Sequence, residues 1–120
     1  MPPKLPKYLF DIQQACEFVR QFVSGKSFAE YIADPLLKAA VERKFEIIGE
    51  AVGQIAKLDP AIATRITAAK RIVAFRNLLI HNYWDVADDL VWGIIEKHLP
   101  VLEGEVNQLL HEIGGPPARP

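Results

Sequence analysis

The sequence has very little sulfur. Its 120 residues include one cysteine, Cys16, and one methionine, Met1. A single cysteine excludes an intramolecular disulfide, and its place in a helical pattern predicts a small buried apolar residue. Residues 1–4 lack the apolar core of a signal peptide, and no apolar run approaches the roughly 20 residues that span a bilayer. We therefore expect a soluble, cytoplasmic protein without a membrane segment.

The chain also lacks a strong net charge, which is −1 at pH 7. This argues against a uniformly basic nucleic-acid coat but leaves room for a local basic patch, above all on a dimer. Apolar residues make up 50% of the chain and charged residues 24%, which is the composition of a globular protein. The length suits one domain with its own core.

Strand-like alternation is absent as well, because apolar residues recur at spacings of three and four. The first such pattern predicts a helix that ends near residues 24–25. Residues 27–30 have the form of a capping box and predict the start of a short second helix. Residues 34–35, an aspartate followed by a proline, predict the start of a long helix that runs to about Leu58.

This long helix carries apolar residues on two sides, which predicts a central helix packed against more than one neighbour. One stripe holds Leu37, Val41, Phe45, Ile48, Val52 and Ile55, and the other holds Leu36, Ala40, Ile47 and Ala51. Gly49 and Gly53 each cost such a helix about 1 kcal/mol relative to alanine, so we expect another backbone to approach closely there. Glu46 and Glu50 fit solvated carboxylates; alternatively, one of them contacts a basic group such as Arg76 across the bundle.

After the long helix, residues 59–67 should form a loop or a short helix, and residues 68–82 a further helix. Three aspartates, Asp85, Asp88 and Asp89, then surround the start of the last predicted helix. N-capping together with the helix dipole explains them. A carboxylate metal site is the alternative.

The last helix has apolar residues as far as Ile113, and Pro100 should kink it by removing one backbone hydrogen bond. Glycines at 114–115 should stop it. The predicted fold is an all-α up-and-down bundle of four main helices plus one short helix. We expect a flexible lead-in over residues 1–6, a single helical domain over residues 7–113 and a disordered tail over residues 114–120.

One segment, residues 76–85, concentrates polar side chains. Arg76, Asn77, His81 and Tyr83 flank the apolar triplet 78–80. Arginine and histidine without a metal set suit RNA cleavage by transfer to the 2′-hydroxyl. An imidazole with a pKa of about 6.5 can act as base or acid at neutral pH. Guanidinium binds phosphate in a bidentate fork and can stabilise the phosphorane oxygens.

The spacing within this segment leaves several interpretations open. Arg76 and His81 lie about 140° apart around a regular helix, so they cannot share one narrow pocket of a straight helix. Asn77 and His81 share a face, where the amide can orient the imidazole. Either the helix ends at His81 and the chain bends, or a second copy completes the site. Taken alone, the residues also fit a structural role, since cations favour helix C-termini.

Together with residues 85–86 and 90–92, this segment resembles the HepT-like ribonuclease toxins of the HEPN superfamily. That superfamily is marked by an arginine, a polar residue, a few further positions and a histidine, which here are Arg76, Asn77 and His81. The HepT branch adds a tyrosine two residues after the histidine, here Tyr83. The resemblance extends to residues 46–51 and 99–100, so that it covers roughly residues 8–112.

The resemblance implies a metal-independent endoribonuclease without cofactors, which forms a homodimer with the motif at the subunit interface. Arg76 and His81 would be catalytic, and Asn77 would support them. It further implies the toxin of a type VII-like toxin–antitoxin system, paired with an MntA-like nucleotidyltransferase antitoxin that transfers AMP to Tyr83. An adenylate there would add bulk and negative charge where the RNA phosphate must sit.

Two alternatives remain: a non-catalytic HEPN binding module that partners a minimal nucleotidyltransferase, and a helical oligomerisation protein without a ligand. His98 and His111 show no zinc-ligand spacing, and we expect packing or solvent exposure for both. Trp84 and Trp92 are expected to anchor the core or an interface. Candidates for an RNA-binding surface, which also fit solvated helix charges, are Arg43, Arg65, Lys70 and Arg71.

Overall fold

The computed structural model describes residues 4–114, except for the side chain of Tyr83. This part of the chain holds seven α-helices, one short 3-10 helix and no strand. They are α1 (Leu5–Val23), α2 (Phe28–Ala33), α3 (Pro35–Leu58), α4 (Pro60–Ala63), α5 (Ala69–His81), the 3-10 helix η1 (Tyr83–Asp85), α6 (Asp88–Lys97) and α7 (Leu99–Glu112). None of these helices combines the length and the apolar character needed to cross a membrane. Residues 1–3 and 115–120, which make up much of the predicted lead-in and tail, lie outside the described residues.

Capping side chains begin three helices, and two of these starts, at Ser27 and Asp34, are the predicted ones. The hydroxyl of Ser27 accepts a hydrogen bond from the backbone N–H of Glu30, and the Glu30 carboxylate accepts one from the N–H of Ser27, which completes the capping box of α2. Asp34 Oδ1 accepts the backbone N–H three residues on at 3.0 Å and begins α3. Asp59 caps α4 in the same way, so a short helix does follow α3.

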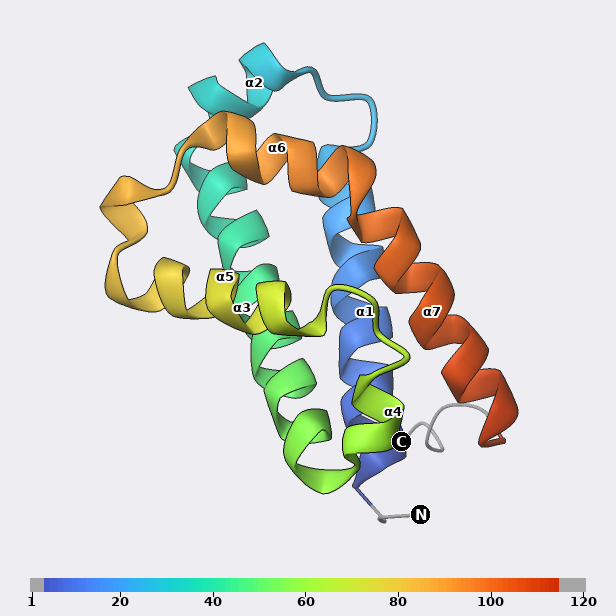
Figure 1. Cartoon of the computed structure of the whole chain (residues 1–120). Helices are drawn as coiled ribbons and strands as arrows, with labels where there is room; N and C mark the ends of the chain where they lie inside the picture. The colour runs from blue at the N-terminus through green and yellow to red at the C-terminus, as the bar shows by residue number, and fades with distance from the viewer. Residues whose placement is uncertain (1–3, 115–120) are drawn as a thin grey trace.

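The three longest helices, α1, α3 and α7, run along the length of the molecule (Figure 1). Both α3 and α7 pack against α1 and run antiparallel to it. Helix α5 crosses α3, and α6 lies across the end of the molecule near α2. The all-α prediction is therefore confirmed. The predicted bundle of four main helices and one short one was too simple, because α5 and α6 run crosswise.

The predicted last helix is two helices. Helix α6 ends at Lys97, His98 lies between, and α7 begins at Leu99 with Pro100 in its first turn. The expected kink is a complete break because proline is favoured in a first turn, where its missing N–H leaves no helical bond unmade. The break lets α6 turn across the bundle while α7 packs along α1.

None of the three aspartates around the start of α6 is its N-cap. Ala87 occupies that position and makes no side-chain capping hydrogen bond, so the N-capping prediction was wrong. Within the first turn, Asp89 Oδ1 accepts the backbone N–H of Leu90 at 2.9 Å. Asp88 and Asp89 lie in the first turn, where the helix dipole favours carboxylates as predicted. Asp88 also pairs with Lys38 at 3.1 Å and thereby ties α6 to α3.

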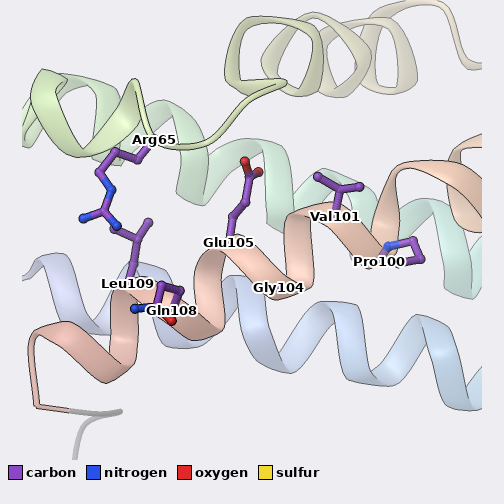
Figure 2. A pocket seen from close by; sticks show the side chains of 7 residues that line it. All are labelled: Arg65, Pro100, Val101, Gly104, Glu105, Gln108 and Leu109. Carbon is purple, nitrogen blue, oxygen red and sulfur yellow. The ribbon is translucent and has the colours of Figure 1, made fainter.

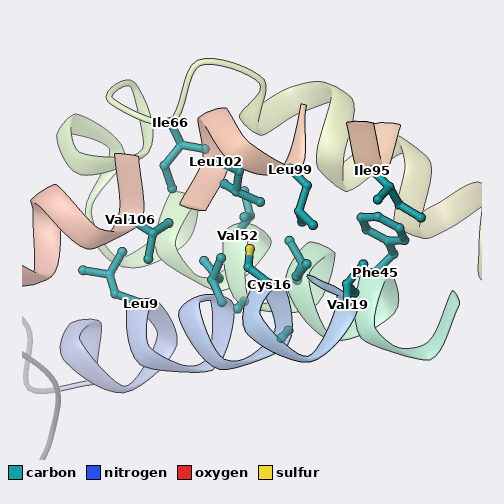
Figure 3. Packing of buried hydrophobic residues seen from close by; sticks show 14 of the residues in the cluster. Leu9, Cys16, Val19, Phe45, Val52, Ile66, Ile95, Leu99, Leu102 and Val106 are labelled. Carbon is teal, nitrogen blue, oxygen red and sulfur yellow. The ribbon is translucent and has the colours of Figure 1, made fainter. Parts of the chain in front are cut away.

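The core fills the space between α1, α3 and α7 (Figure 3). The first predicted stripe of α3 is buried throughout, whereas in the second stripe only Ala51 is buried and Leu36 is 80% exposed. Cys16 is buried as predicted, and this burial raises the pKa of its thiol to about 12. Trp92 packs against Tyr31 with ring centroids 5.3 Å apart and so anchors the core, but Trp84 is 67% exposed.

Candidate active site

Helix α5 carries the motif and ends where the sequence predicts. His81 is its last residue, and Asn82 leaves helical geometry with φ −142° and ψ 44°. The backbone N–H of Asn82 still donates to the carbonyl oxygen of Leu78 at 2.8 Å. The chain then turns into η1. The predicted bend after His81 is thus confirmed, whereas completion of the site by a second copy stays a prediction.

Gly49 allows α5 to lie directly against α3 at Arg76. A Cβ atom added at position 49 would lie 2.2 Å from Arg76 Cβ and 3.3 Å from the carbonyl oxygen of Ile72. The close approach predicted for the two glycines of α3 is therefore confirmed at Gly49. It is absent at Gly53, where an added Cβ would meet Val73 Cγ2 at an ordinary 3.9 Å.

Two side chains hold the guanidinium of Arg76. Its Nη2 donates to Glu50 Oε2 at 2.9 Å, and its Nη1 donates to Asn77 Oδ1 at 3.1 Å. The Arg76 side chain is 30% exposed, and its Nε is buried with no hydrogen-bond partner among the described residues. The sequence left open whether Glu46 and Glu50 are solvated or whether one of them contacts Arg76. Glu50 makes this contact, whereas Glu46 pairs with Arg43 at 3.2 Å. These contacts orient Arg76 on the surface of α3.

His81 is less supported. It is exposed, and no side chain within the described residues forms a hydrogen bond with its imidazole. Asn77 contacts Arg76 instead, so the prediction that its amide orients His81 is not borne out. The backbone of Tyr83 opens η1 two residues later, and its side chain lies outside the described part of the chain. The structure thus joins Arg76 to Asn77 but leaves His81 apart from them.

A hollow of about 370 Å³ lies between α1, α3 and α5, and we call it the motif hollow. It is lined by Lys7, Tyr8, Asp11, Arg43, Glu46, Ile47, Glu50, Ala51, Arg76 and Ile80. Arg76 therefore faces a hollow that His81 does not line. Lys7 and Tyr8 are site residues that the sequence reasoning missed, because no spacing links them to α5. Only the packing of α1 and α5 on α3 brings them near Arg76.

A second hollow, of about 410 Å³, lies along α7 beneath the turn between α4 and α5 (Figure 2). It is lined by Arg65, Pro100, Val101, Gly104, Glu105, Gln108 and Leu109. Arg65 bonds to the Glu112 carboxylate through two contacts of 2.6 Å, so this candidate RNA-binding residue serves to fix the turn to α7. No motif residue reaches this second hollow.

The remaining candidates are spread over the surface. Lys70, Arg71, His98 and His111 are exposed, as the solvent reading of each predicts. Within residues 4–114, no three His, Cys, Asp or Glu side chains gather closely enough to hold a metal ion.

Comparison with known proteins places the chain in a family. Residues 12–109 match the family model described as Ribonuclease HepT-like. A relative from Caldanaerobacter subterraneus subsp. tengcongensis, named "Putative RNase", is 38% identical over 110 residues, which cover 91% of this chain and 97% of the relative. A second, from Thermococcus cleftensis and named "Probable ribonuclease HepT", is 32% identical over 106 residues, covering 85% of this chain and 92% of the relative. No solved structure matches the chain. The match over most of its length, together with the resemblance of its motif, shows that the chain belongs to the HepT-like ribonuclease family.

Proposed function

We propose that this protein is an endoribonuclease that cleaves RNA without a metal ion, with Arg76 and His81 as catalytic residues and Asn77 in support. The observation that carries the proposal is the placement of Arg76. Its stem packs over Gly49, and its guanidinium is oriented by Glu50 and Asn77 at the edge of a hollow. An oriented guanidinium suits the charged oxygens of a phosphoryl-transfer transition state. The names of the relatives support the same activity.

The reaction is a transfer of the phosphoryl group to the neighbouring 2′-oxygen. The His81 imidazole accepts the 2′-hydroxyl proton as O2′ attacks phosphorus, and the bond from phosphorus to O5′ breaks. An imidazolium donates a proton to the departing O5′, which leaves a 2′,3′-cyclic phosphate and a 5′-hydroxyl. Arg76 binds the phosphorane oxygens throughout. Base and acid are separate tasks, and the single motif histidine of each chain can perform only one of them at a time.

A homodimer supplies the second histidine. Two copies that meet about a twofold axis along α5 would bring two Arg76 and two His81 side chains to one groove. The exposed apolar residues at this end of α5 suit such a contact, since Ile80 is 40% exposed and Trp84 67% exposed. The exposed position of His81 also suits a role that a second chain completes.

Regulation follows from the tyrosine of the motif. We place the protein in the cytoplasm, as the toxin of a type VII-like toxin–antitoxin pair whose MntA-like nucleotidyltransferase antitoxin transfers AMP to Tyr83. Tyr83 stands two residues after His81, at the first position of η1. A bulky anionic group there would repel the RNA phosphates that Arg76 attracts.

The activity is tested by incubating purified protein with RNA in the presence of a metal chelator. The wild-type chain and the matched variant His111→Ala, which loses another exposed histidine, should cleave RNA. His81→Ala and Arg76→Ala should each be slower by about 100-fold or more, the range for loss of a general acid–base or an anion-stabilising group. If wild type and His81→Ala are equally inert towards RNA and equally harmless when expressed alone, the ribonuclease proposal fails.

One alternative has an observation in its favour. All three cations of the motif hollow are paired with carboxylates, which suits a protein contact better than a long track of RNA phosphates. The protein would then be a non-catalytic HEPN binding module that partners a minimal nucleotidyltransferase. Such a module binds its partner but cuts no RNA, and Arg76→Ala or His81→Ala changes nothing in a cleavage assay. Intact mass after co-expression shows whether Tyr83 gains AMP; Tyr83→Phe is the control.

A further inference from the structure

The motif hollow extends well beyond the proposed catalytic residues. Arg76 and Ile80 come from α5, but most of the lining comes from α1 and α3. Its volume of about 370 Å³ falls within the roughly 300–1,000 Å³ of small-ligand sites, so it can hold one nucleotide unit but not a helix of RNA. Its position beside Arg76 means that whatever fills it lies next to the proposed scissile phosphate.

The charged side chains of the hollow form three cation–carboxylate pairs. Lys7 pairs with Asp11 at 3.1 Å, Arg43 with Glu46 at 3.2 Å and Arg76 with Glu50 at 2.9 Å. The side chains of Lys7 and Arg43 are 66% and 68% exposed, and such solvent-screened pairs are weak. A phosphate oxygen accepts the same N–H groups as a carboxylate, so it can replace one. The hollow therefore suits a few local phosphates rather than a long polyanionic track.

Tyr8 supplies an aromatic surface within the same hollow. It is half-buried, which fixes its ring against the core, and Lys7 Nζ lies 5.7 Å from the ring centroid. An aromatic ring beside exposed cations is the combination that binds single-stranded nucleic acid, because bases stack on the ring while cations meet the backbone. Bases in a duplex are already stacked and leave no free face for such a ring.

We propose that the motif hollow seats one unstacked nucleotide of a single-stranded RNA. Its base stacks on Tyr8, and its flanking phosphates replace the carboxylate partners of Lys7 and Arg43, which brings the next phosphate to Arg76. This inference rests on the proposed ribonuclease function and narrows its substrate to single-stranded RNA. It assigns binding roles to Lys7, Tyr8 and Arg43 on two helices other than the motif helix.

The test measures binding of a short, unstructured, fluorescent RNA by anisotropy, in a His81→Ala background so that the probe stays intact. The chain offers a matched control, because Lys44 Nζ lies 4.3 Å from the ring centroid of Phe18 on the same two helices but outside the hollow. Tyr8→Leu should weaken binding about tenfold, as expected for loss of one stacked base. Tyr8→Phe and Phe18→Leu should stay within about twofold of the parent, and duplex RNA should bind about tenfold more weakly than the single strand.

Several outcomes overturn the proposal: equal losses for Tyr8→Leu and Phe18→Leu, no loss for Tyr8→Leu, or equal affinity for duplex RNA. So does a change in oligomeric state with Tyr8→Leu but none in RNA affinity, since the hollow is then a contact between protein copies. If Tyr8→Leu does not fold, Lys7→Ala replaces it, with an expected loss of about threefold for one exposed phosphate contact.

The two proposals fail separately. If the wild-type chain cleaves RNA but Tyr8→Leu does not change RNA binding, the proposed nucleotide site is refuted and the ribonuclease proposal stands. If RNA binding depends on Tyr8 but the wild-type chain cuts no RNA, the ribonuclease proposal is refuted and the nucleotide-binding site stands.

Discussion

Arg76 and His81 lie on the same helix, but neighbouring side chains hold Arg76 and none within the described residues holds His81. Arg76 packs over Gly49, bonds to Glu50 and Asn77, and is 30% exposed. His81 is exposed in the last turn of α5, with no hydrogen bond to a described side chain. One chain therefore organises the phosphate-binding half of the proposed site. It leaves the proton-transfer half for whatever approaches the outer end of α5, which we propose is a second copy.

The largest expected effect is on RNA cleavage, where Arg76 and His81 should matter equally, whereas only Arg76 should matter for stability. Arg76→Ala and His81→Ala should each lower the rate of RNA cleavage by about 100-fold or more. Arg76→Ala should also lower the free energy of unfolding by about 1 kcal/mol, because the arginine stem covers α3. His81→Ala should change it by less than about 0.5 kcal/mol, as for other exposed positions. Cleavage kinetics and urea unfolding measure the two quantities.

Equal losses of stability for the two variants would contradict the comparison, because His81 would then be as firmly built into the chain as Arg76. Unchanged cleavage by either variant would remove that residue from the proposed mechanism.

A substitution at Gly49 should disturb the packing of Arg76 against α3. Gly49→Ala places a methyl group 2.2 Å from Arg76 Cβ, so α5 must shift away from α3. We expect a loss of about 1–2 kcal/mol in the free energy of unfolding, from overpacking less the gain in helix propensity, together with reduced cleavage. Gly53→Ala is the control; its added Cβ meets Val73 Cγ2 at an ordinary 3.9 Å, so it should stabilise the chain by up to about 1 kcal/mol. Thermal melts that show both variants equally stable would contradict the close approach.

A substitution at Glu50 should weaken the ion pair that orients the Arg76 guanidinium. Glu50→Gln keeps an acceptor for the Nη2 donor but removes the charge, so Arg76 should be held less firmly. We expect kcat to fall by about fivefold with little change in KM, the pattern for a group that positions a catalytic residue. The free energy of unfolding should change by less than about 0.5 kcal/mol because Glu50 is 55% exposed. Glu46→Gln, which affects Arg43 instead, should leave kcat unchanged; a similar fall in both variants would assign the effect to general electrostatics.

The smallest effect concerns the contact between Arg65 and Glu112, away from the motif helix α5. Hydrogen bonds from Arg65 hold the pKa of the Glu112 carboxyl at about 2, below its ordinary 4.5. A lowered pKa in the folded state stabilises the fold above about pH 4.5, and this contribution disappears as the pH falls from about 4.5 towards 2. Glu112→Gln should therefore lower the urea midpoint slightly at neutral pH and progressively less as the pH falls towards 2, with no effect on RNA cleavage. Loss of cleavage would show that the second hollow belongs to the site.

Helix boundaries could be predicted from the sequence because their causes are local. Ser27, Asp34 and Asp59 begin helices by accepting hydrogen bonds from N–H groups three residues away, so the signal and its effect lie within one turn. Proline at 100 was harder to interpret. The same residue kinks a continuous helix or begins a new one, and the choice depends on whether the segment before it packs along the bundle or across it.

The polar contacts of the site could be predicted only as alternatives. Glu46 and Glu50 have the same charge and lie on the same helix, and nothing in their spacing shows which one meets Arg76. The crossing of α5 over α3 selects Glu50 and leaves Glu46 to Arg43. Asn77 accepts a hydrogen bond from Arg76 at 3.1 Å, so helical spacing alone assigned this amide to the wrong partner.

The sequence by itself determined the all-α class, the starts of α2 and α3, the buried stripe of α3, the end of α5 at His81 and the motif that marks the family. These follow from hydrogen bonds and apolar spacing over a few residues. Only the tertiary structure decided that Gly49 admits Arg76, that Glu50 holds it, and that Lys7 and Tyr8 line the hollow beside it. Those contacts join residues far apart in the chain, and their geometry depends on the angle at which whole helices cross, which no local pattern encodes.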